Sequence, residues 1–215
     1  MLEPIKLKFY NEFIYTQLEE HQPNERDEKV TAQVVNEFIL PLDLTKDADI
    51  KDVGSGWGYF QIEMKKHGYT NICSLDYNLN TVRSLQERQL NFDRRDISFL
   101  PNQDESVDFV FARQCVQHSV FPFFTLMEYN RILKQRAPLY MEVPCPKQPA
   151  NHEMAKGVYS ILTLEMWAAL FFKAGFDIER NQVMTLEYAN KDSQDQILDQ
   201  HFAFLLRKKR PMDIK

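Results

Sequence analysis

Three of the chain's six glycines stand on alternate residues directly after a short apolar run. Residues 49–60 read Asp-Ile-Lys-Asp-Val-Gly-Ser-Gly-Trp-Gly-Tyr-Phe, with the glycines at 54, 56 and 58. Glycine accepts a positive φ and lets a ligand approach the backbone, because it has no Cβ. The pattern predicts a strand that turns tightly against a bound molecule and continues into a helix. An ordinary strand-to-helix turn is the alternative, and the spacing is not the G-x-G-x-x-G of dinucleotide binders.

Acidic residues follow the next strands. Asp76 ends the apolar run 72–75, where an α/β nucleotide site places a carboxylate for the ribose hydroxyls. Asp96 comes after a helical stretch at 80–89, and Asp108 opens the apolar run 109–112. Acids of this kind also serve as helix caps or turn residues. Their order after the glycine turn favours a nucleotide site over a plain turn.

With this order of features the chain resembles the class I S-adenosylmethionine-dependent methyltransferases, in particular the small-molecule, type 11/12-like group with a D-x-G-x-G-x-G loop. The resemblance covers roughly residues 47–210. It implies an α/β, Rossmann-like, doubly wound fold with a mostly parallel seven-stranded sheet and an antiparallel last strand. It also implies S-adenosylmethionine as cofactor, S-adenosylhomocysteine as product, and a small-molecule or glycan-type acceptor. Because the sulfonium donor is already activated, the in-line displacement needs positioning but no metal.

The same resemblance implies the cofactor-binding residues. The methionine and ribose parts would lie against Asp52 and the loop residues Gly54, Ser55, Gly56 and Gly58. The ribose hydroxyls would bind Asp76, and the adenine would pack on Tyr77. Asp96 would accept from the adenine amino group while the Ile97 N–H donates to a ring nitrogen. Arg113 and Gln114, after the fourth strand, would lie at the methionine end.

Four residues are candidates for catalysis on the acceptor side. His118 matches a histidine common in the family group, where it is either a base or a structural residue. Glu142 lies in the fifth strand and could point at the acceptor. Residues 144–162 form a long, polar strand-to-helix connection, and such loops are commonly functional. Within it His152 and Tyr159 are the preferred acceptor-site residues, with loop packing as the alternative.

Composition limits the classes of protein. A chain of 215 residues with 44% apolar and 27% charged residues is normal for one α/β domain, here 1–215, with a full core. The net charge of −5 argues against nucleic acid as a partner. No apolar run is long enough to span a membrane, and residues 1–6 lack the apolar segment of a signal peptide. Three distant cysteines at 73, 115 and 145 indicate reduced thiols in a cytoplasmic protein, with neither disulfides nor a metal site.

The apolar spacing predicts two helices over 1–45 and alternating strands and helices over 46–210. In the family the first region is a lid, so Tyr10 and Tyr15 could face substrate or simply be buried. The first helix repeats Phe9, Phe13, Ile14 and Leu18, and Pro41 ends the second. A later helix would carry Phe123, Phe124, Met127 and Ile132 on one side. Strands are expected at 49–53, 71–75, 96–99, 107–112, 138–143, 176–183 and 201–206, with helices at 57–67, 79–90 and 163–174.

Other features leave alternatives open. Lys51 interrupts a strand that should be apolar on both faces, and Lys134-Gln135-Arg136-Ala137-Pro138 replaces the family's Pro-Gly-Gly turn. The basic residues 207–210 are expected to be a solvated end. A NAD-dependent oxidoreductase is disfavoured by the glycine spacing and Asp96. A nucleic-acid methyltransferase with a nucleophilic Cys145 and a non-catalytic S-adenosylmethionine-binding protein remain alternatives. The acceptor and the oligomeric state are not readable from the sequence.

Overall fold

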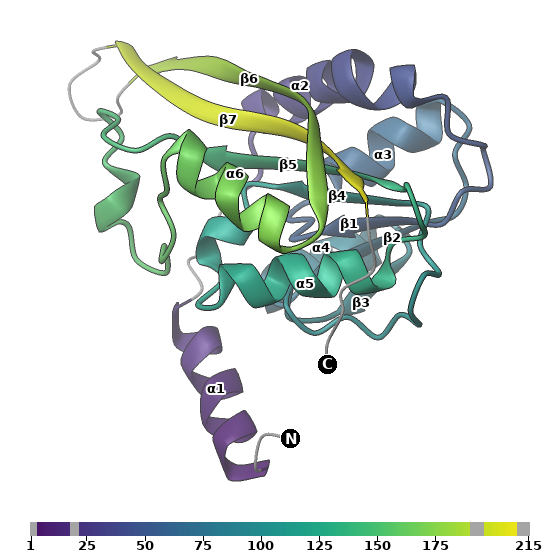
Figure 1. The fold of residues 1–215 in the computed structure, drawn as a ribbon, viewed down its shortest axis with the longest axis horizontal. Helices are drawn as coiled ribbons and strands as arrows, with labels where there is room; N and C mark the ends of the chain where they lie inside the picture. Colours follow the sequence, from purple (N-terminus) through teal and green to yellow (C-terminus); the bar gives the residue numbers. More distant parts are fainter. Residues whose placement is uncertain (1–3, 18–21, 190–195, 210–215) are drawn as a thin grey trace.

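The computed structural model describes residues 4–17, 22–189 and 196–209, which form one seven-stranded sheet with helices on both faces (Figure 1). The strand order is β3-β2-β1-β4-β5-β7-β6, and β7 runs antiparallel to β5 and β6 while the other pairs are parallel. This is the sheet that the sequence predicts. The strands are β1 Ile50–Val53, β2 Ile72–Asp76, β3 Phe92–Arg94, β4 Phe109–Arg113, β5 Pro138–Pro144, β6 Phe176–Ala189 and β7 Gln196–Lys208.

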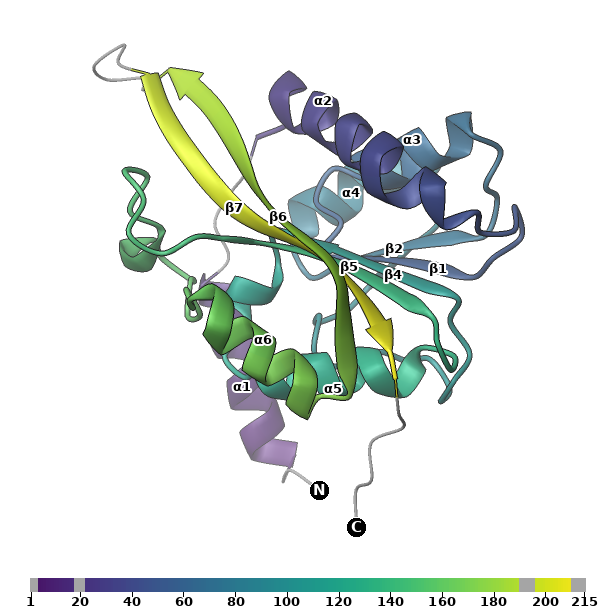
Figure 2. The same cartoon turned by 45° about the horizontal axis from the view of Figure 1, so that its top comes forward.

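Two layers of helices cover the sheet. Figure 2 shows α2 and α3 on one face, and α5 and α6 on the other. The helices are α1 Pro4–Gln17, α2 Glu25–Val34, α3 Tyr59–Lys66, α4 Leu79–Glu87, α5 Pro122–Ile132 and α6 Leu164–Lys173. Short helical turns add η1 Val35–Ile39, η2 Leu40–Leu42, η3 Val116–His118 and η4 His152–Met154. Among the described helices none is long and apolar enough to span a membrane.

The core has one half on each side of the sheet because central strands bury both faces. All seven residues of β5 are buried, and its alternate side chains point to opposite layers. On the α2 side, the ring of Phe111 stacks between Phe60 and Tyr140, at centroid distances of 3.9 and 5.1 Å. On the other side, Phe171 of α6 packs edge-on against Phe204 at 4.9 Å. These two layers hold the carboxyl ends of the parallel strands at one rim.

Two predicted elements were placed wrongly. The third strand is 92–94, not 96–99, so Asp96 lies in the turn that follows it. The carboxylate of Asp96 accepts the N–H of Ser98 at 2.7 Å, a local turn contact that replaces strand pairing. The buried side of α5 carries Leu126, Tyr129 and Ile132, whereas Phe123 and Phe124 are partly exposed. Of the apolar face that the sequence predicts for this helix, Ile132 is buried as expected, whereas Phe123 and Phe124 are not.

The N-terminal helices do not behave as one unit. Val30 and Val34 of α2 are buried against the sheet layer, and Pro41 lies in the turn that ends this helical stretch. In contrast α1 stands apart from the body (Figure 1), with Phe9 70% exposed and Ile14 buried. Leu18 and the side chain of Tyr15 lie outside the described residues. Only α1 therefore has the placement of a lid.

The last two strands are longer than predicted, at 176–189 and 196–208. The expected solvated basic end is wrong for Lys208, which is 1% exposed. Its ammonium donates to the carbonyl of Leu133 at 2.8 Å and pairs with Glu105 at 3.2 Å. Lys51 in β1 has a similar explanation, because its ammonium bonds to Asp49 two residues earlier. Both lysines are tolerated in the sheet because a partner is within reach.

Candidate functional site

The turn after β1 brings the backbone of Gly54 and Ser55 against the end of β2. Both N–H groups donate to the carbonyl oxygen of Leu75, at 2.8 and 3.1 Å. A Cβ on Gly54 would lie 2.3 Å from the Cβ of Cys115, so the first glycine is required by packing within the chain. A Cβ on Gly58 would lie 2.6 Å from leucine side chains, which gives the third glycine a similar role.

Gly56 differs from its two neighbours. It has a φ of +51°, and a Cβ built on it meets no atom within 4 Å among the described residues. The backbone at this position therefore borders open space. Two nearby polar atoms, Ser55 Oγ and Trp57 Nε1, are buried and have no hydrogen-bond partner in the described part of the chain. The middle of the turn is thus the place where a ligand can reach the main chain.

Asp76 holds this turn. One carboxylate oxygen accepts the N–H of Gly56 at 2.8 Å, and the other accepts the N–H of Asn78 at 2.8 Å. Burial raises the pKa of Asp76, and the hydrogen bonds from the two N–H groups lower it in part. A carboxylate has about four acceptor sites, so each oxygen keeps capacity for a ligand hydroxyl beside Gly56.

Asp52, by contrast, is enclosed by the protein, with 2% of its surface exposed. Its carboxyl accepts from the hydroxyl of Ser74 at 3.2 Å, and that hydroxyl lies 3.3 Å from Gln61 Oε1. Burial raises the pKa of Asp52 to about 8 although the bond from Ser74 lowers it. The sequence places Asp52 beside the cofactor, but in the structure its described partners are buried protein groups.

Asp96 and α1 meet at the far side of this rim. Besides the Ser98 N–H, the Asp96 carboxylate accepts from the hydroxyl of Tyr10 at 3.2 Å. The ring of Tyr10 stacks on Phe121 at 6.1 Å and meets Phe99 edge-on at 5.7 Å. Ile97, between Asp96 and Ser98, is half-buried. The helix α1 thus contacts the residue that the resemblance assigns to adenine.

Tyr77, the other residue assigned to adenine, follows Asp76 directly. The guanidinium of Arg94 lies 4.6 Å from the centre of its ring, and Arg94 also donates to the Tyr77 carbonyl at 3.0 Å. One face of the ring is therefore covered by a cation, which leaves the other for packing on a base.

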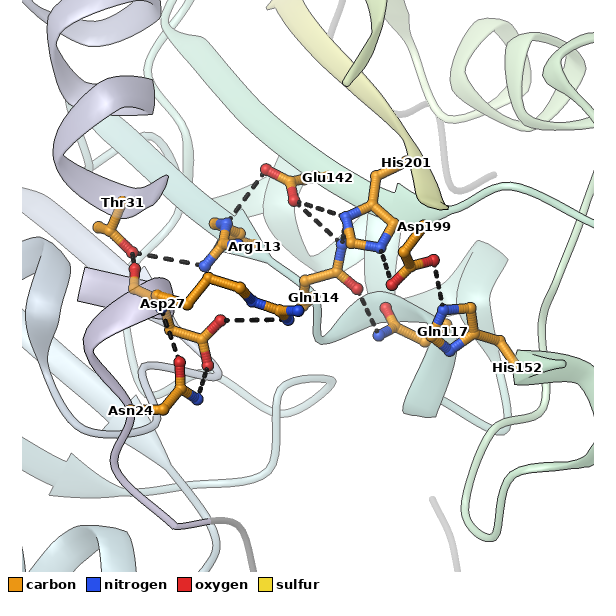
Figure 3. A network of polar contacts seen from close by, with 11 residues as sticks. Asn24, Asp27, Thr31, Arg113, Gln114, Gln117, Glu142, His152, Asp199 and His201 are labelled. Atoms are coloured by element: carbon orange, nitrogen blue, oxygen red, sulfur yellow. Dashed lines mark hydrogen bonds and ion pairs between the residues drawn. The ribbon is translucent and has the colours of Figure 1, made fainter. Parts of the chain in front are cut away.

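A buried polar network runs along the rim from α2 to β7 (Figure 3). At its centre is Glu142, which is fully buried. Its Oε2 accepts from Arg113 at 3.1 Å and from the hydroxyl of Tyr140 at 2.9 Å. Arg113 also reaches Thr31 of α2 at 3.4 Å. Burial would raise the pKa of Glu142, but Arg113 and the His201 ring lower it to about 2, so it is ionised.

The network continues through Gln114 and His201. Glu142 Oε1 accepts from Gln114 Nε2 and lies beside His201 Nδ1, each at 3.1 Å. His201 Nε2 lies 3.0 Å from one oxygen of Asp199, and His152 Nε2 lies 2.8 Å from the other. Burial raises the pKa of Asp199, but the two histidines hold it well below its usual range. Glu142 and His152 were predicted separately and are joined here by two residues of β7.

His118 and Tyr159 take part in the contacts that join η3 to the segment after β5. The Nδ1 of His118 lies 2.8 Å from the carbonyl oxygen of Gly157, so this histidine holds the connection after β5. The backbone N–H of Tyr159 donates to the carbonyl of Gln117 at 2.8 Å, and its half-exposed ring lies 6.3 Å from Phe13 of α1. The segment between β5 and α6 therefore lies beside α1.

Asp199 and His201 are the site residues that the sequence analysis missed. They stand at alternate positions in the last strand, so they share one face of it. The sequence does place an acid and a histidine within a largely apolar strand. A buried polar or charged side chain needs a hydrogen-bond or ion-pair partner, so these two residues could have been noticed. Their partners lie in β5 and in the loop after it, and only the pairing of β5 with β7 brings them together.

Comparison with known proteins identifies the central part of the chain. Residues 51–141 match a family model described as a methyltransferase domain. This stretch contains the glycine turn, Asp76 and Asp96, and it ends in β5. A search of curated proteins found no match.

Solved structures show the same fold over nearly the whole chain. A putative sarcosine dimethylglycine methyltransferase from Galdieria sulphuraria has a TM-score of 0.69 and 14% identity, covering 95% of this chain and 97% of that one. A putative methyltransferase from Bacillus halodurans C-125 has a TM-score of 0.68 and 13% identity, covering 86% and 99%. The [4+2]-cyclase SpnF has a TM-score of 0.65 and 15% identity, covering 85% and 80%. At such identities the similarity establishes the fold.

Proposed function

We propose that this chain, which is an S-adenosylmethionine-dependent methyltransferase, transfers the methyl group to a small-molecule or glycan-type acceptor at the rim where β1, β2, β4 and β5 end. The observation that carries the cofactor site is the open backbone at Gly56, held by Asp76 within the matched methyltransferase stretch. We treat residues 1–215 as a single domain in which α1 serves as the lid.

The residues of the rim fit the cofactor. The bare backbone of Gly56 admits a close approach, and Asp76 accepts the two ribose hydroxyls with its remaining lone pairs. Tyr77 offers its uncovered ring face to the adenine, and Asp96 and the N–H of Ile97 complete its recognition. When bound, S-adenosylmethionine supplies a methyl group on an activated sulfonium, so the protein's task is to hold acceptor and methyl in line.

Arg113 and Gln114 act at the methionine end through the network rather than as free groups. Glu142 binds both side chains, and its own oxygens are occupied by four donors. We therefore assign Glu142 a positioning role and keep the acceptor side for His118, His152 and Tyr159. His118 holds the connection after β5 in place, and the half-exposed Tyr159 faces the space beside α1.

The alternatives lose support from the geometry. A cytosine methyltransferase would need a reactive thiolate, whereas Cys145 is 5% exposed and burial raises its pKa to about 12. Thiols of that kind are poor nucleophiles. The similarity to SpnF shows that this fold also carries a reaction of another kind in that protein. Turnover of S-adenosylmethionine with a panel of small hydroxyl and amine acceptors separates methyl transfer from cofactor binding alone.

The decisive experiment is calorimetry of S-adenosylhomocysteine with Asp76→Ala. Loss of charge-assisted contacts to the ribose, each worth about 1.5–3 kcal/mol, should lower the affinity at least about tenfold. The matched control is Asp93→Ala, which changes a partly exposed aspartate on neighbouring β3. Equal affinity in folded Asp76→Ala and wild type, or tighter binding of NAD than of S-adenosylhomocysteine, would contradict the proposal.

A further inference from the structure

His152, Asp199 and His201 form a compact group of metal-ligating side chains. One ligand atom from each lies within 4.8 Å of the other two, and one Asp199 oxygen is 2.8 Å from His152 Nε2 while the other is 3.0 Å from His201 Nε2. Two imidazoles and one carboxylate make the donor set of many zinc and other first-row transition-metal sites. Ligand atoms around tetrahedral Zn²⁺ are about 3.3 Å apart, given bonds of about 2.0–2.2 Å. Small side-chain shifts would therefore bring this group into that geometry.

A second observation concerns His201 alone. The residue is 4% exposed, and Nε2 has no hydrogen-bond partner among the described residues, although it lies 3.0 Å from one oxygen of Asp199 as an ion-pair contact. A buried polar atom without a partner calls for an explanation. Nδ1 lies 3.1 Å from Glu142 Oε1 and 2.9 Å from Gln114 Nε2. In the tautomer whose Nδ1–H donates to Glu142, Nε2 carries a lone pair that faces an anionic oxygen at 3.0 Å. A cation between these two atoms would satisfy both.

The surroundings match those of a metal site. His201 Nδ1 lies 3.1 Å from the Glu142 carboxylate, and a carboxylate bonded to the other ring nitrogen commonly fixes the orientation of a metal-ligating histidine. Asp199 and His201 lie on a rigid, paired strand of the sheet. His152 lies on η4, and its side chain is 25% exposed, so the group is open to solvent on that side. Three protein ligands leave a further coordination position for water or an acceptor oxygen.

We propose that His152, Asp199 and His201 bind one divalent transition-metal ion of the Zn²⁺ class at the rim beside the acceptor side. The sequence analysis, from the spacing of the cysteines, predicts no metal site. His152 is 47 residues from Asp199 in the chain, so no local motif links these two side chains. The site can be tested without S-adenosylmethionine, because its ligands are not the residues assigned to the cofactor.

The test uses the full chain, freed of any affinity tag and of metal, titrated with Zn²⁺ by calorimetry and with Co²⁺ by visible absorption. Wild type should bind one ion per chain, and Co²⁺ should give the d–d bands of a low-symmetry nitrogen and oxygen site. His152→Ala and Asp199→Asn should each weaken Zn²⁺ binding at least about tenfold. Mutation of residues that merely support the ligands already lowers metal affinity about 10–100-fold. Zn²⁺ should also raise the melting temperature of wild type more than that of His152→Ala.

His67→Ala is the matched control, because it removes a partly exposed histidine from a surface pair with Glu63 on α3. It should bind Zn²⁺ as wild type does. His152 is on a surface turn, so His152→Ala decides the question even if Asp199→Asn does not fold. No saturable binding by wild type, or equal affinity in wild type and His152→Ala, would show that the three residues are an ion-pair cluster only. The metal titration contains no S-adenosylmethionine, so its outcome does not depend on the test of the cofactor site.

Discussion

Three acidic residues of the parallel strands, Asp52, Asp76 and Glu142, differ in burial and in hydrogen-bond partners, and therefore in their roles. Asp76 stands at the open turn and keeps acceptor capacity beside Gly56. Asp52, two residues before the turn, is enclosed and bonded to Ser74. Glu142 is enclosed as well, but it is ionised because Arg113 and His201 are within reach. Burial raises the pKa of a lone carboxyl and charged partners reverse that effect, so the local partners decide which acid carries charge.

Asp52 should make the protein less stable as the pH rises. Its pKa in the folded state is about 8, above the ordinary value of 3.8, so the folded state binds the proton more tightly. The contribution of Asp52 to stability is therefore full below about pH 4 and is lost as the pH rises toward 8. Asp52→Asn keeps an acceptor for Ser74 without the charge, so it should flatten this part of the pH profile and be the more stable protein at pH 8.

Urea denaturation at several pH values between 4 and 8 measures this difference, with each pKa unit worth about 1.4 kcal/mol. Asp93→Asn, at a partly exposed position, should leave the pH dependence of the unfolding free energy as it is in wild type. Parallel profiles for wild type and Asp52→Asn would show that Asp52 is ionised in the folded protein.

At the scale of elements, α1 stands apart from the body of the protein (Figure 1). The contacts of its described side chains include the Tyr10 bond to Asp96, the rings around Tyr10, and the approach of Phe13 to Tyr159. By comparison α2 buries valines against the sheet layer. A helix with few buried contacts opens at a low free-energy cost. This suits a lid over the cofactor rim.

Hydrogen exchange should therefore be at least about tenfold faster in α1 than in α5. Tyr10→Phe keeps the ring contacts and removes one hydrogen bond to a carboxylate, worth roughly 1.5–3 kcal/mol, so it should speed the exchange of α1 further. Phe9→Ala, at a side chain that is 70% exposed, serves as the control and should not alter it. Mass spectrometry of peptides from the exchanged protein measures these rates. If the amides of α1 exchange as slowly as those of α5, the lid role proposed for α1 is wrong.

For the whole molecule, the decisive feature is the insertion of β7 between β5 and β6. Residues from the end of the chain complete the rim network through Asp199 and His201. The same strand ends in Lys208, whose ammonium reaches Leu133 and Glu105 at the opposite end of the sheet. Both the site and the closure of the fold therefore depend on this one strand.

Lys208→Ala should destabilise the whole protein. It leaves the carbonyl of Leu133 without its donor, at a cost of roughly 1–3 kcal/mol, and also removes the buried stem of the lysine. Lys209→Ala, whose partly exposed side chain pairs with Asp177, should cost less than about 0.5 kcal/mol. Denaturant unfolding of the two variants compares them directly. A similar small change in both would mean that the buried ammonium contributes nothing to stability.

The sequence by itself determined the features that depend on near neighbours. The glycine turn, the acid at the end of β2 and the alternation of strands and helices were readable because backbone preference and apolar periodicity act over a few residues. The place of Gly56 on the open side of the turn was not, since its neighbours Gly54 and Gly58 carry the same local signal.

Only the tertiary structure decided which polar side chains meet. Glu142, His152, Asp199 and His201 come from a strand, a loop and a second strand, and the antiparallel register of β5 and β7 joins them. That register depends on packing across the sheet, which no local pattern specifies. The burial of Asp52 and Lys208 has the same origin, because enclosure results from the elements that pack around a residue and not from the residue itself.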